Sequence, residues 1–257
     1  MLCSEIIKIL ERQSPPEYAL GWDNVGLLVG RYSKEVKKLA IALDATNTVI
    51  EKAIEQNVDM IITHHPVIFS KIGRINDETV LGRKILSMIE NNICCYAMHT
   101  NFDTKGGMAK LAANMLNLKN QMVLEESNMG EGIGRIGILD ETISLCKLAD
   151  LVKTKFELSN VIVFGDNETH IEKVAISPGS GKSVIEVAIK SGAQCLVTGD
   201  IGHHEGLDAV EAGLTIIDAS HYGLEKIFMQ FMASYLADFC RDVEIGIIDQ
   251  GETFTVI

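Results

Sequence analysis

The chain has 257 residues, of which 47% are hydrophobic and 23% are charged, a composition typical of a globular protein with a sizeable core. Its formal net charge of −12 argues against broad contact with a phosphate backbone, so we expect no double-stranded nucleic-acid partner. The sequence lacks both the roughly eighteen apolar residues of a membrane span and the basic start of a signal peptide, so we expect a cytoplasmic protein without a membrane partner.

The first half alternates short apolar runs with amphipathic segments. Residues 1–13 predict a helix with Ile6, Ile7 and Leu10 on one face and Ser4 as its cap. The elements that follow are a strand at 39–43, a helix carrying Ile50, Ala53 and Ile54, a strand at 59–63, a helix around Leu81–Ile89 and a strand at 93–98. Strands that alternate with helices predict a parallel sheet with crossover helices.

An internal repeat organises the chain. Residues 38–63 align without a gap with residues 173–198, at a constant offset of 135 and with nine identities in 26 positions. Both copies are interpreted as strand, turn, helix and strand. The match spans two types of element, which favours a duplication over the chance similarity of two amphipathic segments.

The second half continues in the same way. A strand at 174–177 leads through the loop PGSGKS into a helix, and a strand at 195–198 leads through a helix at 207–212 to a strand at 214–219. The loop lacks the first glycine of a phosphate-binding P-loop, because Ile176 stands there. We therefore predict two related α/β halves, residues 1–125 and 126–257, each with a largely parallel sheet and crossover helices.

Histidines gather where the predicted strands end. Six of the seven follow four of these strands, in the segments THHP (63–66), MHTNFD (98–103), TGDIGHHE (198–205) and ASHYGLE (219–225). Functional groups of open parallel sheets lie beyond the carboxyl ends of the strands. The six cysteines form no C-x-x-C pair and favour buried, reduced thiols. The histidine clustering is thus the main functional signal.

Spacing suggests how these side chains could converge. His64 and His65 are neighbours leaving a strand, so they point to different sides and favour two ions over one. His221 and Glu225 are four residues apart at the start of a long predicted helix, so they share one face. Asp103 follows a strand in a polar turn.

These residues would form a mixed site of imidazoles and carboxylates. Such a set suits zinc, iron, manganese or nickel and is too rich in nitrogen for a calcium or magnesium cage. Two ions about 3.5–4 Å apart can activate a water and polarise the bond that it attacks. Each feature also has an ordinary structural interpretation, such as a hydrogen-bonded histidine or a solvated helix face. Their shared position at strand ends favours a site for two divalent metal ions.

Five motifs in this order resemble the GTP cyclohydrolase I type 2 homologue family, also called the YbgI-like or NGG-one-interacting-factor-three-like family. They are GWDNVGLLVG (21–30), DMIITHHPVIF (59–69), YAMHTNFD (96–103), VTGDIGHHE (197–205) and ASHYGLEK (219–226). The resemblance implies two α/β halves, a dinuclear metal site between them and a ring-shaped homohexamer. It implies that His65 and Asp103 hold one ion, that His64 and His221 hold the other, and that Glu225 bridges them. Ser220 stands where many members have glycine.

Two functions are compatible with this pattern. The first is a metal-dependent hydrolase, cyclohydrolase-like, that acts on a small nucleotide-like substrate. His99 is then the foremost candidate for acid–base catalysis, with His203 and His204 as further candidates. The second is a metal-binding or regulatory interaction protein without catalysis. The sequence names neither the substrate nor the native metal.

Overall fold

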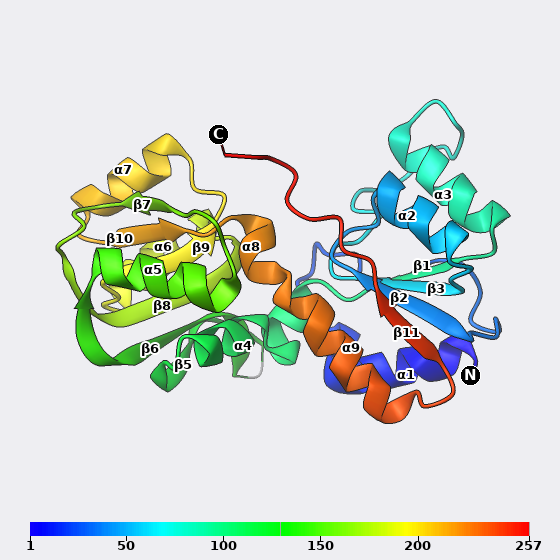
Figure 1. The fold of residues 1–257 in the computed structure, drawn as a ribbon, viewed down its shortest axis with the longest axis horizontal. Helices are drawn as coiled ribbons and strands as arrows, with labels where there is room; N and C mark the ends of the chain where they lie inside the picture. The colour runs from blue at the N-terminus through cyan, green and yellow to red at the C-terminus, as the bar shows by residue number, and fades with distance from the viewer. Residues whose placement is uncertain (129, 257) are drawn as a thin grey trace. The chain divides into compact units, whose positions relative to one another are not determined.

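The computed structural model describes residues 1–128 and 130–256. The chain forms two compact units (Figure 1). The first comprises Met1–Gly106 and Phe228–Gly251, and the second comprises Gly107–Ile227 with the C-terminal residues from Glu252. Residue 125, where the sequence places a domain boundary, lies within a strand of the second unit. The predicted boundary itself stays a prediction.

The first unit is built on a five-stranded sheet of order β1-β4-β3-β2-β11. The strands β2, β3, β4 and β11 run parallel, and β1 joins the edge in the antiparallel direction. The elements of this unit are β1 (Gly26–Val29), β2 (Lys38–Ala42), β3 (Met60–Thr63), β4 (Cys94–Ala97), β11 (Glu244–Ile247), α1 (Cys3–Gln13), α2 (Asn47–Glu55), α3 (Val80–Glu90) and α9 (Ile227–Phe239).

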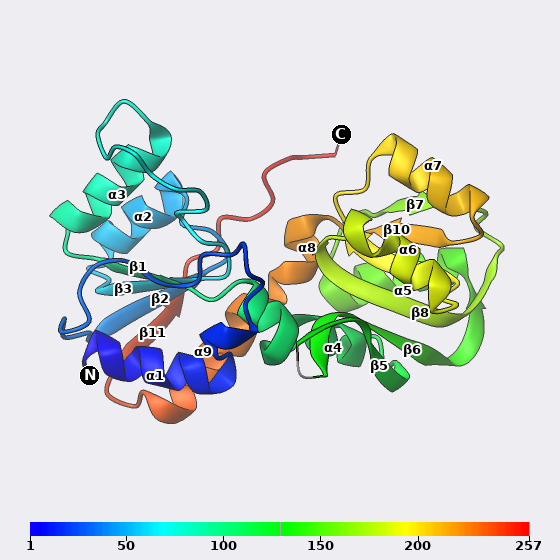
Figure 2. The same cartoon turned by 180° about the vertical axis from the view of Figure 1, so that it is seen from behind.

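Helices cover both faces of this sheet (Figures 1 and 2). On one face α2 and α3 pack onto the strands through a cluster that includes Ile50, Ile61 and Ile85. On the other face α9 contacts α1, where the hydroxyl of Tyr235 donates to the carbonyl of Ile9 at 3.1 Å. Because helices cover both faces of the sheet, every residue of β3 and β4 is buried.

The second unit has a six-stranded sheet of order β5-β6-β8-β9-β10-β7. The strands β8, β9 and β10 run parallel, whereas β5, β6 and β7 pair in the antiparallel direction. The elements are β5 (Lys119–Asn128), β6 (Glu131–Ser144), β7 (Ile162–Phe164), β8 (His170–Ser180), β9 (Cys195–Gly199), β10 (Thr215–Asp218), α4 (Met108–Met115), α5 (Leu145–Phe156), α6 (Ile185–Lys190), α7 (His203–Glu211) and α8 (His221–Glu225). Val174 faces the cluster formed with α4 and α5, and its neighbour Ala175 faces the cluster with α6 and α7.

The two sheets pair their central strands in the same register. Leu39 lies opposite Met60 in the first sheet, and Val174 lies opposite Cys195 in the second. A shift of 135 carries the first pair onto the second, which is the offset of the sequence repeat. This agreement supports the interpretation of the repeat as a duplication.

The next strand extends the correspondence. Met60 pairs with Cys94, 34 residues later, and Cys195 pairs with Thr215, 20 residues later. The second unit therefore has the shorter crossover. In both units an antiparallel strand then closes this side of the sheet, β1 beside β4 and β7 beside β10. The order of four strands is thus shared.

Two local predictions need correction. Ser4 is not the cap of the first helix: α1 begins at Cys3, and the backbone N–H of Leu2 donates to the Glu5 carboxylate. The long helix expected from residue 221 is divided into α8 and α9, with Lys226 between them. Apolar spacing indicates neither the capping contact of Glu5 nor the end of α8 at Glu225. Among the described residues, no helix is long and apolar enough to cross a membrane.

Candidate metal centre

The carboxyl edge of the first sheet gathers three histidines. His64 and His65 follow β3, and His99 follows β4 one residue beyond Met98. One ring nitrogen from each of the three lies within 4.8 Å of one from each of the others. Their imidazole ring centroids are 4.9–5.4 Å apart. Because β3 and β4 are parallel neighbours, the predicted convergence of these histidines in one unit is confirmed.

Asp103 joins this cluster from a helical turn. The segment Phe102–Gly106 forms one turn of π-helix, a rare conformation that is frequent at functional sites. The turn is held by the fully buried ring of Phe102, which packs edge-on against Phe228 of α9. It brings a carboxylate oxygen of Asp103 to 3.5 Å from Nε2 of His64. A carboxylate and an imidazole nitrogen therefore face one another.

Each histidine of the cluster is oriented through its Nδ1 atom. The Nδ1 of His64 lies 3.1 Å from the carbonyl oxygen of Met98. The Nδ1 of His65 lies 2.9 Å from the carboxylate of Asp44, which follows β2. Metal-binding histidines commonly hydrogen-bond a carbonyl or carboxylate in this way, which fixes the tautomer and leaves Nε2 as the ligand atom. These two histidines therefore have the outer contacts expected of metal ligands.

His99 depends on a buried carboxylate. The side chain of Asp23 has no exposed surface, and one of its oxygens lies 2.9 Å from Nδ1 of His99. Its other oxygen accepts from the backbone N–H and the hydroxyl of Thr100. Burial by itself raises the pKa of Asp23, but the hydrogen bonds from His99 and Thr100 lower it to about 2. Asp23 is thus an anion that fixes the orientation of His99.

The second unit carries its own imidazole–carboxylate pair on α8. The Nε2 of His221 lies 3.1 Å from a carboxylate oxygen of Glu225, and the Nδ1 of His221 lies 2.7 Å from the carboxylate of Asp200. Glu225 is 3% exposed. The predicted i, i+4 convergence is confirmed, and His221 shows the same Nδ1 contact as the histidines of the first unit.

Two glycines allow α8 to approach the sheet. A Cβ atom on Gly179 would lie 2.4 Å from the Glu225 carboxylate, and one on Gly199 would lie 2.5 Å from the backbone nitrogen of His221. The glycine-rich loop that resembles a P-loop therefore provides space for a buried carboxylate. Ser220 precedes α8 with a φ of 60°, a value that favours glycine. Its side chain caps the helix by accepting from the N–H of Gly223.

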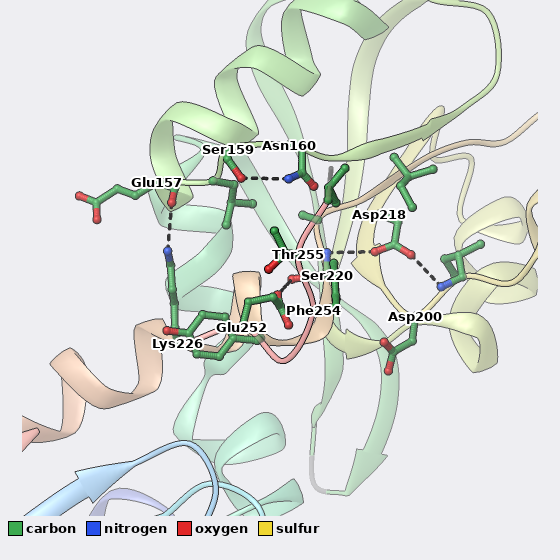
Figure 3. A pocket seen from close by; sticks show the side chains of 16 residues that line it. Glu157, Ser159, Asn160, Asp200, Asp218, Ser220, Lys226, Glu252, Phe254 and Thr255 are labelled. Atoms are coloured by element: carbon green, nitrogen blue, oxygen red, sulfur yellow. Dashed lines mark hydrogen bonds between the residues drawn. The ribbon is translucent and has the colours of Figure 1, made fainter. Parts of the chain in front are cut away.

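A cavity of about 380 Å³ lies next to α8 in the second unit (Figure 3). Its lining includes four carboxylates, and the C-terminal segment contributes Phe254, Thr255 and Val256. The four acidic residues are Glu157, Asp200, Asp218 and Glu252. The carboxylate of Asp218 accepts hydrogen bonds from the backbone N–H groups of Ile201 and Ser220. The cavity thus borders the contact that orients His221.

The sequence pattern identified the histidines but missed their partners. Asp23, Asp44 and Asp200 were not predicted, although Asp44 and Asp200 follow predicted strands and obey the same positional rule. His203 and His204 are exposed at the start of α7, with ring centroids 5.2 Å apart. All six cysteines are free thiols, and Cys146 alone is exposed. The prediction of buried thiols therefore holds for five of the cysteines and is wrong for Cys146.

The sequence matches one protein family along almost all of its length. The match is to Duf34/NIF3 (NGG1p interacting factor 3), and it covers residues 1–253. A relative from Clostridium acetobutylicum, named GTP cyclohydrolase 1 type 2 homolog, is 38% identical over 225 residues. That alignment covers 86% of this chain and 84% of the relative. The word "homolog" in this name leaves the activity open.

Solved structures share the fold. A Bacillus cereus protein described as related to NIF3 has a TM-score of 0.91 and 25% identity, and the match covers 100% of this chain and 99% of that one. The structure described as reduced HcgD from Methanocaldococcus jannaschii has a TM-score of 0.85 and 33% identity, with coverage of 96% and 97%. The two-sheet arrangement described above is therefore common to these proteins.

Proposed function

We propose that this chain, which belongs to the Duf34/NIF3 family, binds two divalent metal ions and acts as a metal-dependent hydrolase on a small nucleotide-like substrate. One observation carries the proposal. Each of the histidines His64, His65, His99 and His221 has its Nδ1 atom at hydrogen-bond distance from a carbonyl or a carboxylate. That arrangement selects Nε2 as the atom that meets a metal ion or a substrate.

The donor set fits transition-metal ions. We assign His65 and Asp103 to one ion, His64 and His221 to the other, and Glu225 to a bridge between them, as the family resemblance implies. The close approach of His64 to Asp103 places ligands of the two proposed ions side by side, and that of His221 to Glu225 places a terminal ligand beside the proposed bridge. Imidazole with carboxylate suits zinc, iron, manganese or nickel.

The reaction class follows from this set of groups. When bound, two such ions activate a water and polarise the bond that it attacks. His99 is then the acid–base residue. Asp23 holds its Nδ1, so His99 exchanges a proton with the substrate through Nε2. The relatives named GTP cyclohydrolase 1 type 2 homolog support a cyclohydrolase-like reaction on a purine nucleotide.

Metal analysis and a nucleotide assay test the proposal together. Protein purified without chelator and supplied with each candidate metal should contain two ions per chain. It should also convert one or more purine nucleotides in a panel followed by chromatography. The variant His99→Gln should keep both ions and lose activity by about a hundredfold or more. His170→Gln is the control, because His170 is exposed at the start of β8.

The outcomes separate the alternatives. Fewer than one ion per chain after supplementation would exclude the metal site. Two ions without conversion of any nucleotide would instead favour a metal-binding or regulatory interaction protein.

We also propose that the chain assembles into a toroidal homohexamer, as the resemblance implies. Its acidity supports an enclosed chamber that attracts cations. Light scattering should give a mass near six times 28.1 kDa. A monomer at micromolar concentration would exclude the ring.

A further inference from the structure

Two large aromatic rings lie exposed beside His99. Trp22 is 59% exposed and Phe69 is 57% exposed, and their ring centroids are 5.7 Å apart. Both rings contact the imidazole of His99, at centroid distances of 5.9 Å for Trp22 and 6.2 Å for Phe69. Exposed aromatic groups next to a polar site are typical of binding surfaces.

Hydrogen bonds connect the two backbone segments that carry these rings. Asp23, which is buried and bound to His99, also accepts from the backbone N–H of Asn24 at 2.8 Å. The side chain of Asn24 in turn donates to the carbonyl of Ile68, at 2.6 Å. Asp23 and Asn24, which follow Trp22, are therefore connected by hydrogen bonds to Ile68, which precedes Phe69. The backbone that carries the two rings is thus ordered before a ligand binds, which reduces the entropy that binding costs.

His99 connects the rings to the metal-ligand cluster. Its imidazole lies 5.2 Å from that of His64 and 5.4 Å from that of His65, measured between centroids. A ligand stacked on Trp22 and Phe69 is thus adjacent to His99, the proposed acid–base residue. His99 in turn lies between that ligand and the proposed metal ligands His64 and His65. That position suits the reacting ring of a small substrate. A protein partner would need a larger apolar surface.

We propose that Trp22 and Phe69 form a stacking platform for the flat, conjugated nitrogen heterocycle of the substrate and present that ring to His99. The inference rests on the proposed function for the identity of the reaction, but the binding of a ring is testable separately. Stacking uses the π-face that every nucleobase has, so it fits a purine without requiring basic residues for phosphate. It also gives a role to Trp22 in the motif GWDNVGLLVG, next to Asp23, which orients His99.

Trp22 is the only tryptophan in the chain, so its fluorescence reports on the platform directly. We would titrate purified protein with guanosine, exciting beyond the absorption of the nucleoside, and repeat the titration with ribose 5-phosphate. Guanosine carries a purine without phosphate, and ribose 5-phosphate carries phosphate without a ring. The expected result is saturable quenching by guanosine and little change with ribose 5-phosphate.

Variants that keep Trp22 test the second ring. Phe69→Ala should weaken guanosine binding by about tenfold, whereas Phe69→Tyr, which keeps a stacking face, should bind like the original protein. Tyr32→Ala is the matched control, because Tyr32 is an equally exposed aromatic at 60%. Tyr32 follows Val29, at the end of β1 that pairs with Cys95. The histidine cluster lies near the other end of β1, where Gly26 pairs with Ala97. Tyr32→Ala should therefore bind guanosine normally.

Each outcome has a defined meaning. Quenching that depends on Phe69, in a protein that converts no nucleotide, supports the platform and rejects the proposed reaction. Nucleotide conversion with no effect of Phe69→Ala on quenching or on KM rejects the platform and leaves the reaction standing. Absence of saturable quenching at millimolar guanosine also rejects the platform. Emission that changes with protein concentration instead would show that a second copy of the chain covers Trp22, which likewise rejects it.

Discussion

The carboxyl edges of the two sheets share one backbone register but carry different chemistry. After β3 stand His64 and His65, whereas the equivalent positions are Gly199, the last residue of β9, and Asp200, which follows it. The first edge thus presents imidazoles directly from a strand end. The second has a glycine there, and the backbone of α8 occupies the space that a side chain would fill. The same scaffold can therefore supply ligands from a strand end or from a helix packed against it.

The carboxylates follow a more uniform rule. Asp103 comes from the helical turn after β4, and Glu225 comes from the helix after β10, the equivalent strand. In each unit the helical segment after the equivalent strand directs a carboxylate toward an imidazole of the same unit. Substitutions on the two edges should reveal how far these similar positions have acquired different functions.

The largest effect is expected at Glu225. If this carboxylate bridges two ions, Glu225→Ala should reduce the metal content from two ions per chain to almost none. His64→Ala and Asp103→Ala should each remove mainly one ion, because a terminal ligand serves a single metal. Elemental analysis of the three purified variants measures this directly. Equal losses in all three would exclude the bridging role and would make the two edges energetically equivalent.

A smaller but still clear effect is expected at Gly199. In Gly199→Ala the new Cβ would meet the backbone of Ser220 and His221 at 2.6 and 2.5 Å. Neither atom belongs to a flexible side chain, so α8 must shift, and we expect a loss of about 1–3 kcal/mol in the free energy of unfolding. Gly73→Ala, which meets nothing within 4 Å, should change it by less than about 0.5 kcal/mol. Urea unfolding followed by circular dichroism gives both values. Equal stability of the two variants would contradict the close packing of α8.

The same comparison shows what sequence could and could not predict. Apolar runs marked the ends of β3 and β4, so the gathering of His64, His65 and Asp103 was predictable from a rule about parallel strands. The register was predictable too, because a gap-free repeat carries its strand pairing with it. These features depend on residues close to one another in the chain or on a period that can be counted.

The partners of the histidines depend on longer connections. Asp23 meets His99 across 76 residues, from a loop in which no periodicity marks it. The division between α8 and α9 was missed because the apolar spacing continues past Lys226 and hides the break. The antiparallel hairpin of β5 and β6 was missed for a different reason. Residues 119–128 are largely polar, and their pairing is set by the sheet that they join.

Asp44 and Asp200 provide a direct test of the two edges, since each orients one histidine of its own unit. Asp44→Asn and Asp200→Asn should each weaken metal affinity by about 10–100-fold while leaving the number of ions unchanged at saturating metal. Competition with a chromophoric chelator measures the affinity. Asp140→Asn, which affects an exposed ion pair with Lys119, is the control. From the sequence, we predict that Asp200 is not itself a ligand. Loss of a whole ion at saturating metal in Asp200→Asn would show that it is one.

The smallest effect concerns the buried anion of the first edge and appears as a dependence on pH. The folded-state pKa of Asp23 is lowered from 3.8 to about 2, so the folded protein holds its proton less tightly than the unfolded chain. The stabilisation is therefore complete above the unfolded value and disappears as the pH falls from about 4 through 2. A shift of this size corresponds to at most about 2 kcal/mol.

The stability difference between the original protein and Asp23→Asn should accordingly shrink by up to that amount between pH 6 and pH 2. Thr100→Ala removes one of the two side-chain donors to Asp23 and should give an intermediate dependence. Urea unfolding at both pH values measures all three proteins. A difference that stays constant with pH would mean that Asp23 titrates alike in both states and that His99 is not oriented by an anion.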